Sequence, residues 1–252
     1  PILTFIYTLL GGFLISGGAN AMNNVWDADL DQRMHRTARR PIPAGRIGRR
    51  EAAAVALLFS ALGLLLLWTF VNATAAGLAL AGWIWYVGIY TMILKRWSPQ
   101  NVVIGGAAGG FAPLVGWAAI TGRVDPMALF LFALIFFWTP PHTWAFAILT
   151  ERDYREAGIP MLPVVTGARP AALQALIYTG ILMALGLVPF LIRAMGWMYL
   201  AGALLLNAWL LLLALRLWQD PSKAHARRLY HASNTYLFLF FIVMVVDRLV
   251  RG

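Results

Sequence analysis

Apolar runs of about twenty residues recur along the whole chain, and they constrain the fold more than any other feature of the sequence. A helix of ~20 residues crosses the ~30 Å hydrocarbon layer of a bilayer, so each run is a candidate membrane span. Hydrophobic residues make up 61% of the 252 positions and charged residues only 12%, about half the share in soluble domains. We therefore predict one domain, residues 1–252, folded as an all-α polytopic transmembrane helical bundle. The eight candidate spans are residues 1–23, 51–71, 74–94, 101–121, 126–149, 171–192, 196–217 and 234–250.

The basic residues are distributed unevenly between the two sides of this arrangement. When loops alternate between the membrane faces, sixteen of the twenty Lys and Arg residues fall on one side, in residues 24–50, 95–100, 150–170 and 216–233. Cytoplasmic loops carry the excess of Lys and Arg, so we predict that these loops face the cytoplasm of a bacterial plasma membrane. Pro1 and Gly252 are then expected outside. Orientation in lipid accounts for the net charge of +10, and a nucleic-acid partner is not expected.

Oxygen ligands for a metal ion gather where the first span meets the predicted cytoplasmic face. The chain has no cysteine, so a metal site must use oxygen or imidazole ligands. Asn23, Asp27 and Asp31 recur at intervals of four, so a continuing helix stacks them on one side, about 6 Å apart, while Asp29 points elsewhere. Stacked carboxylates repel each other unless a cation lies between them. The set suits Mg²⁺, which takes one or two carboxylates and completes its shell with water and substrate phosphate.

Arginines follow these carboxylates directly. The four arginines between residues 33 and 40 have guanidinium forks that match phosphate oxygens bidentately. Carboxylates and arginines together can therefore bind a metal–diphosphate from both ends. For the three arginines between residues 46 and 50 we favour another interpretation, in which they are solvated, fix the topology and meet anionic lipid.

A second acidic cluster, residues 151–156, follows the fifth span on the same predicted face. Two acidic clusters on one face can hold metal ions on both sides of a diphosphate and stabilise its charge as the carbon–oxygen bond breaks. Asp153 is the strongest candidate ligand here. A mixed-charge interfacial loop is the alternative, and it applies more strongly to Glu151 and Glu156.

Two further features lie inside the predicted spans. In the fifth span, Pro140 and Pro141 are expected to kink the helix, and His142 follows about 10 Å below its cytoplasmic end. A polar intramembrane residue is a site candidate, but a lone imidazole can also satisfy a freed carbonyl, and the sequence leaves both open. In the fourth span, glycines either allow close helix packing, which we favour, or leave room for a ligand. These glycines are Gly105, Gly106, Gly109, Gly110 and Gly116.

Taken together, several motifs resemble a known family. They are Asn23-xxx-Asp27-xxx-Asp31, Arg36-Thr37, Arg40-Pro41, Tyr90-Thr91, Leu94-Lys95-Arg96, Pro140-Pro141-His142 and Asp153-Tyr154 before Gly158-Ile159-Pro160-Met161-Leu162-Pro163. The first resembles the aspartate-rich motif of the UbiA-type prenyltransferase superfamily. The last two resemble its haem branch, the protoheme IX farnesyltransferases or haem O synthases. The resemblance covers essentially the whole chain, although Asp153-xx-Glu156 departs from the Asp-xxx-Asp common elsewhere in the superfamily.

This resemblance implies a nine-helix bundle with a central cavity, whose first helix is expected before Pro1. It implies that Mg²⁺ held by aspartates binds farnesyl diphosphate, and that the farnesyl group is transferred, with hydration, to the 2-vinyl group of haem b. Haem A synthase or terminal-oxidase assembly factors are the implied partners. The implied catalytic and metal-binding residues are Asp27, Asp31 and Asp153. The implied substrate-binding residues are Asn23, Arg36, Arg40, Lys95, Arg96, His142, Tyr154 and Glu156.

Two other functions compete with this one. A quinone-pathway aromatic prenyltransferase would share the diphosphate site, but the Pro-Pro-His motif argues against it. A transporter or haem-handling membrane protein without catalysis would carry its acids near the middle of the bilayer. The acids of this chain lie instead at one predicted face.

Overall fold

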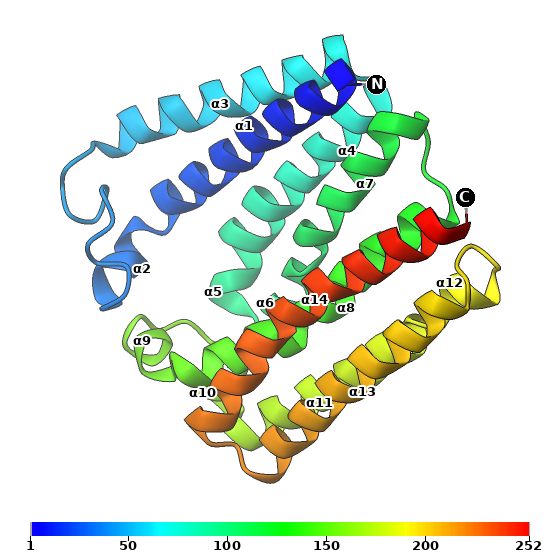
Figure 1. Ribbon diagram of the computed structural model, residues 1–252. Coiled ribbons are helices and arrows are strands. Elements are labelled where there is room, and N and C mark those ends of the chain that lie inside the picture. The colour runs from blue at the N-terminus through cyan, green and yellow to red at the C-terminus, as the bar shows by residue number, and fades with distance from the viewer. Residues whose placement is uncertain (1, 252) are drawn as a thin grey trace. The chain divides into compact units, whose positions relative to one another are not determined.

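The computed structural model describes residues 2–251, and within them every regular element is a helix (Figure 1). Eight helical segments in this part of the chain are long and apolar enough to cross a membrane, which confirms the predicted number of spans. They are Ile2–Trp26, Arg49–Phe70, Ala73–Trp97, Asn101–Thr121, Pro126–Leu149, Ala168–Leu191, Trp197–Gln219 and Lys223–Arg251. Pro1 and Gly252, which we expect on the outer face, lie outside the described residues.

The chain forms two compact units, each of which is described by itself. Unit 1 comprises the chain up to Phe132 together with Arg152–Pro160. Its helices are α1 (Ile2–Trp26), α2 (Ala28–Arg33), α3 (Arg49–Phe70), α4 (Ala73–Trp83), η1 (Ile84–Leu94), α5 (Lys95–Trp97), α6 (Asn101–Gly105), α7 (Ala107–Thr121), the start of α8 (Pro126–Leu149) and most of α9 (Glu151–Glu156). Unit 2 holds the rest of α8, then α10 (Leu162–Thr166), α11 (Ala168–Leu185), α12 (Val188–Leu191), α13 (Trp197–Gln219) and α14 (Lys223–Arg251).

Small residues let α1 and α3 run side by side in unit 1 (Figure 1). A Cβ atom added at Gly18 of α1 would lie 2.6 Å from the carbonyl oxygen of Ala56 on α3. One added at Gly63 of α3 would lie 2.6 Å from the backbone nitrogen of Ile15. Glycine at these positions therefore allows backbone contact between the two helices, which is the usual way that membrane helices gain van der Waals packing.

Two glycines of α6 and α7 pack closely against aromatic rings. A Cβ at Gly105 would lie 2.2 Å from the Tyr90 ring, and one at Gly110 would lie 2.7 Å from the Phe132 ring. Close packing, the interpretation that we favour from the sequence, is confirmed at these two positions. Gly116 has open space beside it.

The third span changes helix type partway along. It begins as the α-helix α4, continues as the π-helix η1 and ends in the short helix α5. The backbone N–H of Lys95 donates to the carbonyl of Tyr90, five residues earlier, so the wide π register extends to the first residue of α5. No feature of the sequence predicts this π-helix. Such segments are rare and occur frequently at functional sites.

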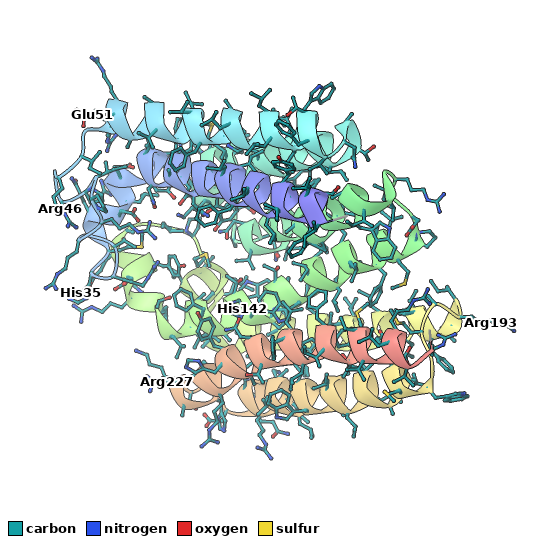
Figure 2. The ribbon with its side chains drawn as sticks, turned by 45° about the horizontal axis from the view of Figure 1, so that its top comes forward. His35, Arg46, Glu51, His142, Arg193 and Arg227 are labelled. Atoms are coloured by element: carbon teal, nitrogen blue, oxygen red, sulfur yellow. The ribbon has the colours of Figure 1, made fainter. Side chains whose placement is uncertain are left out.

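In unit 2, α13 packs against both α11 and α14. The predicted span 234–250 lies within α14, but the helix is longer than the span and begins eleven residues earlier, at Lys223. His225 and His231, expected in a loop, therefore lie on a helix. The first turns of α14 are polar, and hydropathy reports only the apolar part of a helix. Figure 2 shows Arg193 and Arg227 at opposite ends of this unit, as the alternation of loops predicts.

Candidate active site

The three stacked polar residues lie at the end of α1, where the helix is interrupted but its direction is kept. The backbone N–H of Asp27 donates to the carbonyl of Asn23 at 2.9 Å, and that of Asp31 donates to the carbonyl of Asp27 at 2.8 Å. Asn23, Asp27 and Asp31 are 8%, 0% and 1% exposed. The side chain of Asp29 is 44% exposed. The structure thus confirms the predicted stacking, and it confirms that Asp29 points elsewhere.

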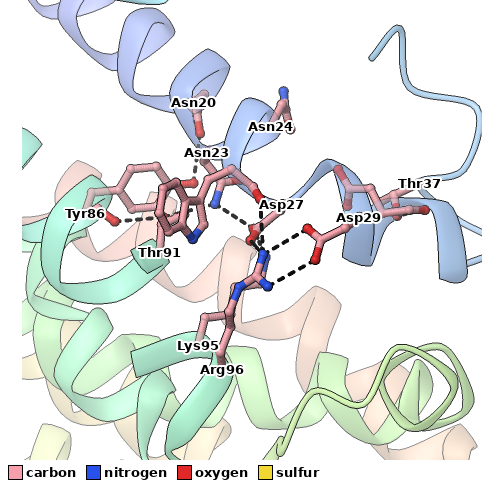
Figure 3. A network of polar contacts seen from close by, with 12 residues as sticks. Asn20, Asn23, Asn24, Asp27, Asp29, Thr37, Tyr86, Thr91, Lys95 and Arg96 are labelled. Carbon is pink, nitrogen blue, oxygen red and sulfur yellow. Dashed lines mark hydrogen bonds and ion pairs between the residues drawn. The ribbon is translucent and has the colours of Figure 1, made fainter. Parts of the chain in front are cut away.

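Asp27 receives both of its hydrogen bonds on one carboxylate oxygen (Figure 3). Asn23 Nδ2 donates to Asp27 Oδ2 at 2.9 Å, and the Lys95 ammonium donates to the same atom. Asp27 Oδ1 is buried and accepts no hydrogen bond. Arg96 forms an ion pair with this oxygen, with its Nη2 3.8 Å from Oδ1. One oxygen of this carboxylate is therefore fixed, and the other is available to a ligand.

Asp31 shows the same division between its two oxygens. Arg40 Nη1 donates to Asp31 Oδ2 at 2.8 Å and to Asn24 Oδ1 at 2.8 Å. The Thr37 hydroxyl donates to the backbone carbonyl of Asp31 at 3.1 Å, which ties the following loop to α2. Asp31 Oδ1 is buried without a hydrogen-bond partner.

Asp29 and Arg96 form a bidentate pair beside these buried groups. Arg96 Nη1 and Nη2 donate to the two Asp29 oxygens at 3.1 and 2.9 Å, and Nη2 also donates to the Trp26 carbonyl at 3.1 Å. The hydrogen bond from Arg96 lowers the pKa of the exposed Asp29 carboxyl below its ordinary value. The aspartates at 27, 29 and 31 are thus matched in charge by Lys95, Arg40 and Arg96.

The donor set of this cluster fits Mg²⁺. Two buried carboxylate oxygens that accept no hydrogen bond are hard ligands that would gain from a divalent cation, because a buried polar atom without a hydrogen bond is unfavourable. In residues 2–251 no three acidic or histidine side chains gather closely enough to hold one ion. The protein side therefore supplies one or two carboxylates, and a diphosphate and water would have to complete the octahedron.

The second acidic segment lies in the same unit and reaches the loop after α2. The backbone N–H of Arg36 donates to Asp153 Oδ2 at 3.4 Å, and the Arg36 side chain bonds to that of Tyr154. Burial raises the pKa of Tyr154, so its phenol stays neutral. Glu156 instead pairs with Arg152 at 2.7 Å on a largely exposed surface, where an ion pair contributes little. Asp153 and Tyr154 are thus brought to the loop between α2 and α3, which carries Arg36 and Arg40 and is called the arginine loop, whereas the ion pair of Glu156 is local to α9.

His142 lies in unit 2 between two aromatic rings. Its ring centroid is 4.4 Å from that of Trp138 and 4.7 Å from that of Tyr230, both in stacked orientation. Its Nδ1 lies 2.8 Å from Ser233 Oγ, and the Ser233 hydroxyl donates its proton to the Tyr230 carbonyl at 2.8 Å. With the Ser233 proton on the Tyr230 carbonyl, Nδ1 carries the ring proton and donates to Ser233, and the lone pair is on Nε2. The imidazole is held by a serine hydroxyl, and a kink carbonyl is not its partner at Nδ1.

Sequence reasoning missed three members of the unit 1 cluster. Thr91 accepts a hydrogen bond from Asn23, Asn24 accepts one from Arg40, and Asp29 forms the bidentate pair with Arg96. The arginines and Lys95 were expected to bind diphosphate, and the structure shows that Lys95, Arg40 and Arg96 also neutralise the aspartates. The pairing between α1 and the third span joins residues about seventy positions apart, and no local sequence signal marks it.

Comparison with known proteins places the chain in a family. The profile of the UbiA prenyltransferase family matches residues 1–244. A protoheme IX farnesyltransferase of Chloroflexus aurantiacus is 48% identical over 247 residues, which cover 98% of this chain and 42% of that protein. A protoheme IX farnesyltransferase of Thermus thermophilus is 50% identical over 246 residues, covering 98% of this chain and 40% of that protein. The chain therefore spans less than half the length of these two curated relatives.

Solved structures share the fold at low sequence identity. A digeranylgeranylglyceryl phosphate synthase matches with a TM-score of 0.81 and 20% identity, covering 98% of this chain and 86% of that one. A UbiA homolog from Archaeoglobus fulgidus bound to GPP and Mg²⁺ matches with a TM-score of 0.68 and 20% identity, covering 97% of this chain and 89% of that one. The fold of this chain is that of the UbiA proteins.

Proposed function

The chain belongs to the UbiA prenyltransferase family, and from this premise we propose that it transfers the farnesyl group of farnesyl diphosphate to haem b. The acceptor is the 2-vinyl group, and the products are haem O and diphosphate. Relatives at 48% and 50% identity that are named protoheme IX farnesyltransferase support this choice of acceptor. The observation that carries the proposal is the pair of buried aspartates, each with one unbonded oxygen, surrounded by matched cations.

Asp27 and Asp31 bind the metal in this proposal through the oxygens that accept no hydrogen bond. Mg²⁺, when bound, would neutralise the diphosphate and make it a better leaving group. The UbiA homolog described as bound to GPP and Mg²⁺ supports this choice of ion. Asp153, which contacts the loop after α2, would hold a second metal ion on the other side of the same diphosphate.

The basic residues then hold the diphosphate. With a divalent cation balancing the negative charge of the aspartates, Lys95, Arg40 and Arg96 can donate some of their hydrogen bonds to phosphate oxygens. Arg36 supplies a further guanidinium group. Positive charge so placed stabilises the negative charge that develops as the carbon–oxygen bond breaks. Tyr86 is stacked on Tyr90 in η1 with ring centroids 5.8 Å apart. Their electron-rich faces stabilise the allylic cation without acting as competing nucleophiles.

We assign the haem side of the reaction to His142. Its Nδ1–H is committed to Ser233, so Nε2 keeps a lone pair that can ligate the haem iron or accept a hydrogen bond from the haem. The flanking rings of Trp138 and Tyr230 fix the imidazole plane, which makes the direction of that lone pair constant.

The placement of the acids argues against a transporter. Asp27 directly follows the last residue of α1, so it lies at the end of a span. Coupling carboxylates of transporters lie near the middle of the membrane instead. We propose that this end faces the cytoplasm of a bacterial plasma membrane, because the basic loops cluster there. Association with haem A synthase or terminal-oxidase assembly factors stays a prediction.

Mass spectrometry of haem extracted from cells that express the full-length protein tests this function. We expect a new haem that is heavier than haem b by one hydroxyfarnesyl group. Purified protein in membranes, supplied with haem b, farnesyl diphosphate and Mg²⁺, should form the same product. A prenylated 4-hydroxybenzoate in place of a modified haem would show a quinone-pathway enzyme, and unchanged substrates would contradict the proposal.

A further inference from the structure

The contacts between α1 and the third span form a ladder of three rungs (Figure 3). Tyr86 Oη donates to Asn20 Oδ1 at 3.1 Å. Asn23 Nδ2 donates to Thr91 Oγ1 at 3.0 Å. The Lys95 ammonium donates to Asp27 Oδ2. The residues at the end of α1 and directly after it are spaced by three and four, as one face of an α-helix requires, whereas those on the third span are spaced by five and four.

The π-helix is what places these three partners on one face. In an α-helix each residue turns about 100°, so Thr91 would lie about 140° around the axis from Tyr86. In a π-helix the hydrogen bonds join residues five apart, so side chains spaced by four or five residues lie on the same side of the helix. The Thr91 hydroxyl itself follows this register, because it donates to the Tyr86 carbonyl five residues earlier at 2.8 Å. The π-helix η1 therefore directs the side chains of Thr91 and Lys95 toward the same face of the first span.

The direction of each hydrogen bond in the middle rung is determined. A threonine hydroxyl has one proton, and Thr91 gives it to the Tyr86 carbonyl. Thr91 must therefore accept from Asn23, so the NH₂ group of the amide faces Thr91. The second proton of that NH₂ group goes to Asp27 Oδ2 at 2.9 Å. The Asp27 carboxylate can only accept, so it requires the NH₂ group on its side, and Thr91 Oγ1 supplies the acceptor for the remaining proton of that group.

We propose that Thr91 is a positioning residue of the metal site, because it holds Asn23 in the orientation that keeps Asp27 Oδ1 free for a divalent cation. The inference rests on the proposed diphosphate-binding function. Thr91 is fully buried, and its hydroxyl accepts from Asn23 and donates to the Tyr86 carbonyl. Without its oxygen the second N–H of the Asn23 amide has no acceptor, so Asp27 alone holds the amide and the side chain can swing away from the carboxylate. The Asp27 side chain would then lose one of the two donors that fix it.

Binding of inorganic pyrophosphate tests this role without the transfer reaction. Full-length protein in nanodiscs is titrated calorimetrically with pyrophosphate, at saturating Mg²⁺ and again with EDTA. Thr91→Val keeps the side-chain shape and removes the hydroxyl, so it should raise the Kd at saturating Mg²⁺ about tenfold. Thr91→Ser retains the hydroxyl and should stay within about twofold of the wild type.

Two further variants separate positioning from general damage. Asn23→Ala should itself weaken binding, and adding Thr91→Val in that background should change nothing more, because Thr91 acts through Asn23. Thr179→Val is the matched control, since Thr179 is a buried threonine whose hydroxyl donates only to Ala175 in its own helix. It should bind pyrophosphate as the wild type does.

Several outcomes would overturn the inference. These are wild-type affinity in Thr91→Val, an equal effect of Thr91→Val with and without Asn23, or a loss in Thr179→Val as large as in Thr91→Val. Wild-type protein that binds no pyrophosphate with Mg²⁺ would overturn both this role and the metal assignment. The expected binding pattern without any modified haem would refute only the proposed function.

Discussion

Replacing Lys95 with methionine should destabilise the protein in a way that Mg²⁺ repairs. The Lys95 side chain is 14% exposed and that of Asp27 is 0% exposed, so the substitution leaves a buried carboxylate without its counter-ion. Removing one partner of a buried ion pair costs about 3–5 kcal/mol, and the slight exposure of Lys95 favours the lower value, ~3 kcal/mol. For a chain of this length the unfolding midpoint should fall by about 6–12 °C.

Mg²⁺ should restore most of this loss. At 100 times its Kd, a ligand that binds only the folded state stabilises it by about 2.7 kcal/mol, close to the ~3 kcal/mol lost. Wild-type protein should gain less, because there the cation binds beside the Lys95 ammonium. The eleven tryptophans allow unfolding in nanodiscs to be followed by intrinsic fluorescence, with and without Mg²⁺.

The chain offers a matched control, because Lys223 is its second and last lysine. Lys223 is exposed at the start of α14, so Lys223→Met removes the same charge without uncovering a buried acid. It should leave both the midpoint and the Mg²⁺ response unchanged. Equal shifts by Mg²⁺ in the wild type and in Lys95→Met would refute the reasoning, since Asp27 would then not be where the cation binds.

Two further predictions concern stability. Asp247 is buried on α14, and its carboxylate accepts hydrogen bonds from the backbone N–H groups of Gly196 and Tyr199 at the start of α13, at 2.7 and 2.9 Å. Asp247→Ala removes both acceptors, so it should lower the free energy of unfolding by about 1–3 kcal/mol, measured by denaturant titration. An unchanged midpoint would show that this cap is dispensable. The hydrogen bond from Arg96 lowers the pKa of Asp29 in the folded protein below 3.8, its value in the unfolded chain. The pair therefore stabilises the fold fully above pH 3.8, and this stabilisation is lost as the pH falls through the lower pKa of the folded state. Asp29→Asn should therefore lower the thermal midpoint at neutral pH, and its difference from the wild type should shrink below pH 3.8; a difference independent of pH would contradict this.

The sequence predicts the number of spans because bilayer thickness sets the length of an apolar run. It predicts the stacking of Asn23, Asp27 and Asp31 because helical spacing is local, and backbone hydrogen bonds continue through the break after Trp26. The start of α14 was not predictable from hydropathy. Residues 223–233 are basic and polar, so their helical structure carries no apolar signal.

The ion pairs of the site could not be predicted from the sequence. Lys95 and Arg96 are brought to α1 by a π-helix, and the sequence of residues 84–94 has no pattern that distinguishes it from an ordinary apolar α-helix. The π register decides which side chains face α1, so Thr91 could not be assigned a role beside Asn23. The charge of Lys95 suggested a phosphate ligand, and only the structure shows the carboxylate that it neutralises.

Equilibrium binding of labelled farnesyl diphosphate to the purified protein, with Mg²⁺ or with EDTA, tests the central claim most directly. Asp27 and Asp31 hold the metal in this account, so Mg²⁺ should be required for tight binding by the wild type. Asp27→Ala should weaken binding in Mg²⁺ by about 10–100-fold and remove most of the difference between Mg²⁺ and EDTA. Binding by Asp27→Ala that keeps both the wild-type affinity and the full dependence on Mg²⁺ would contradict the account.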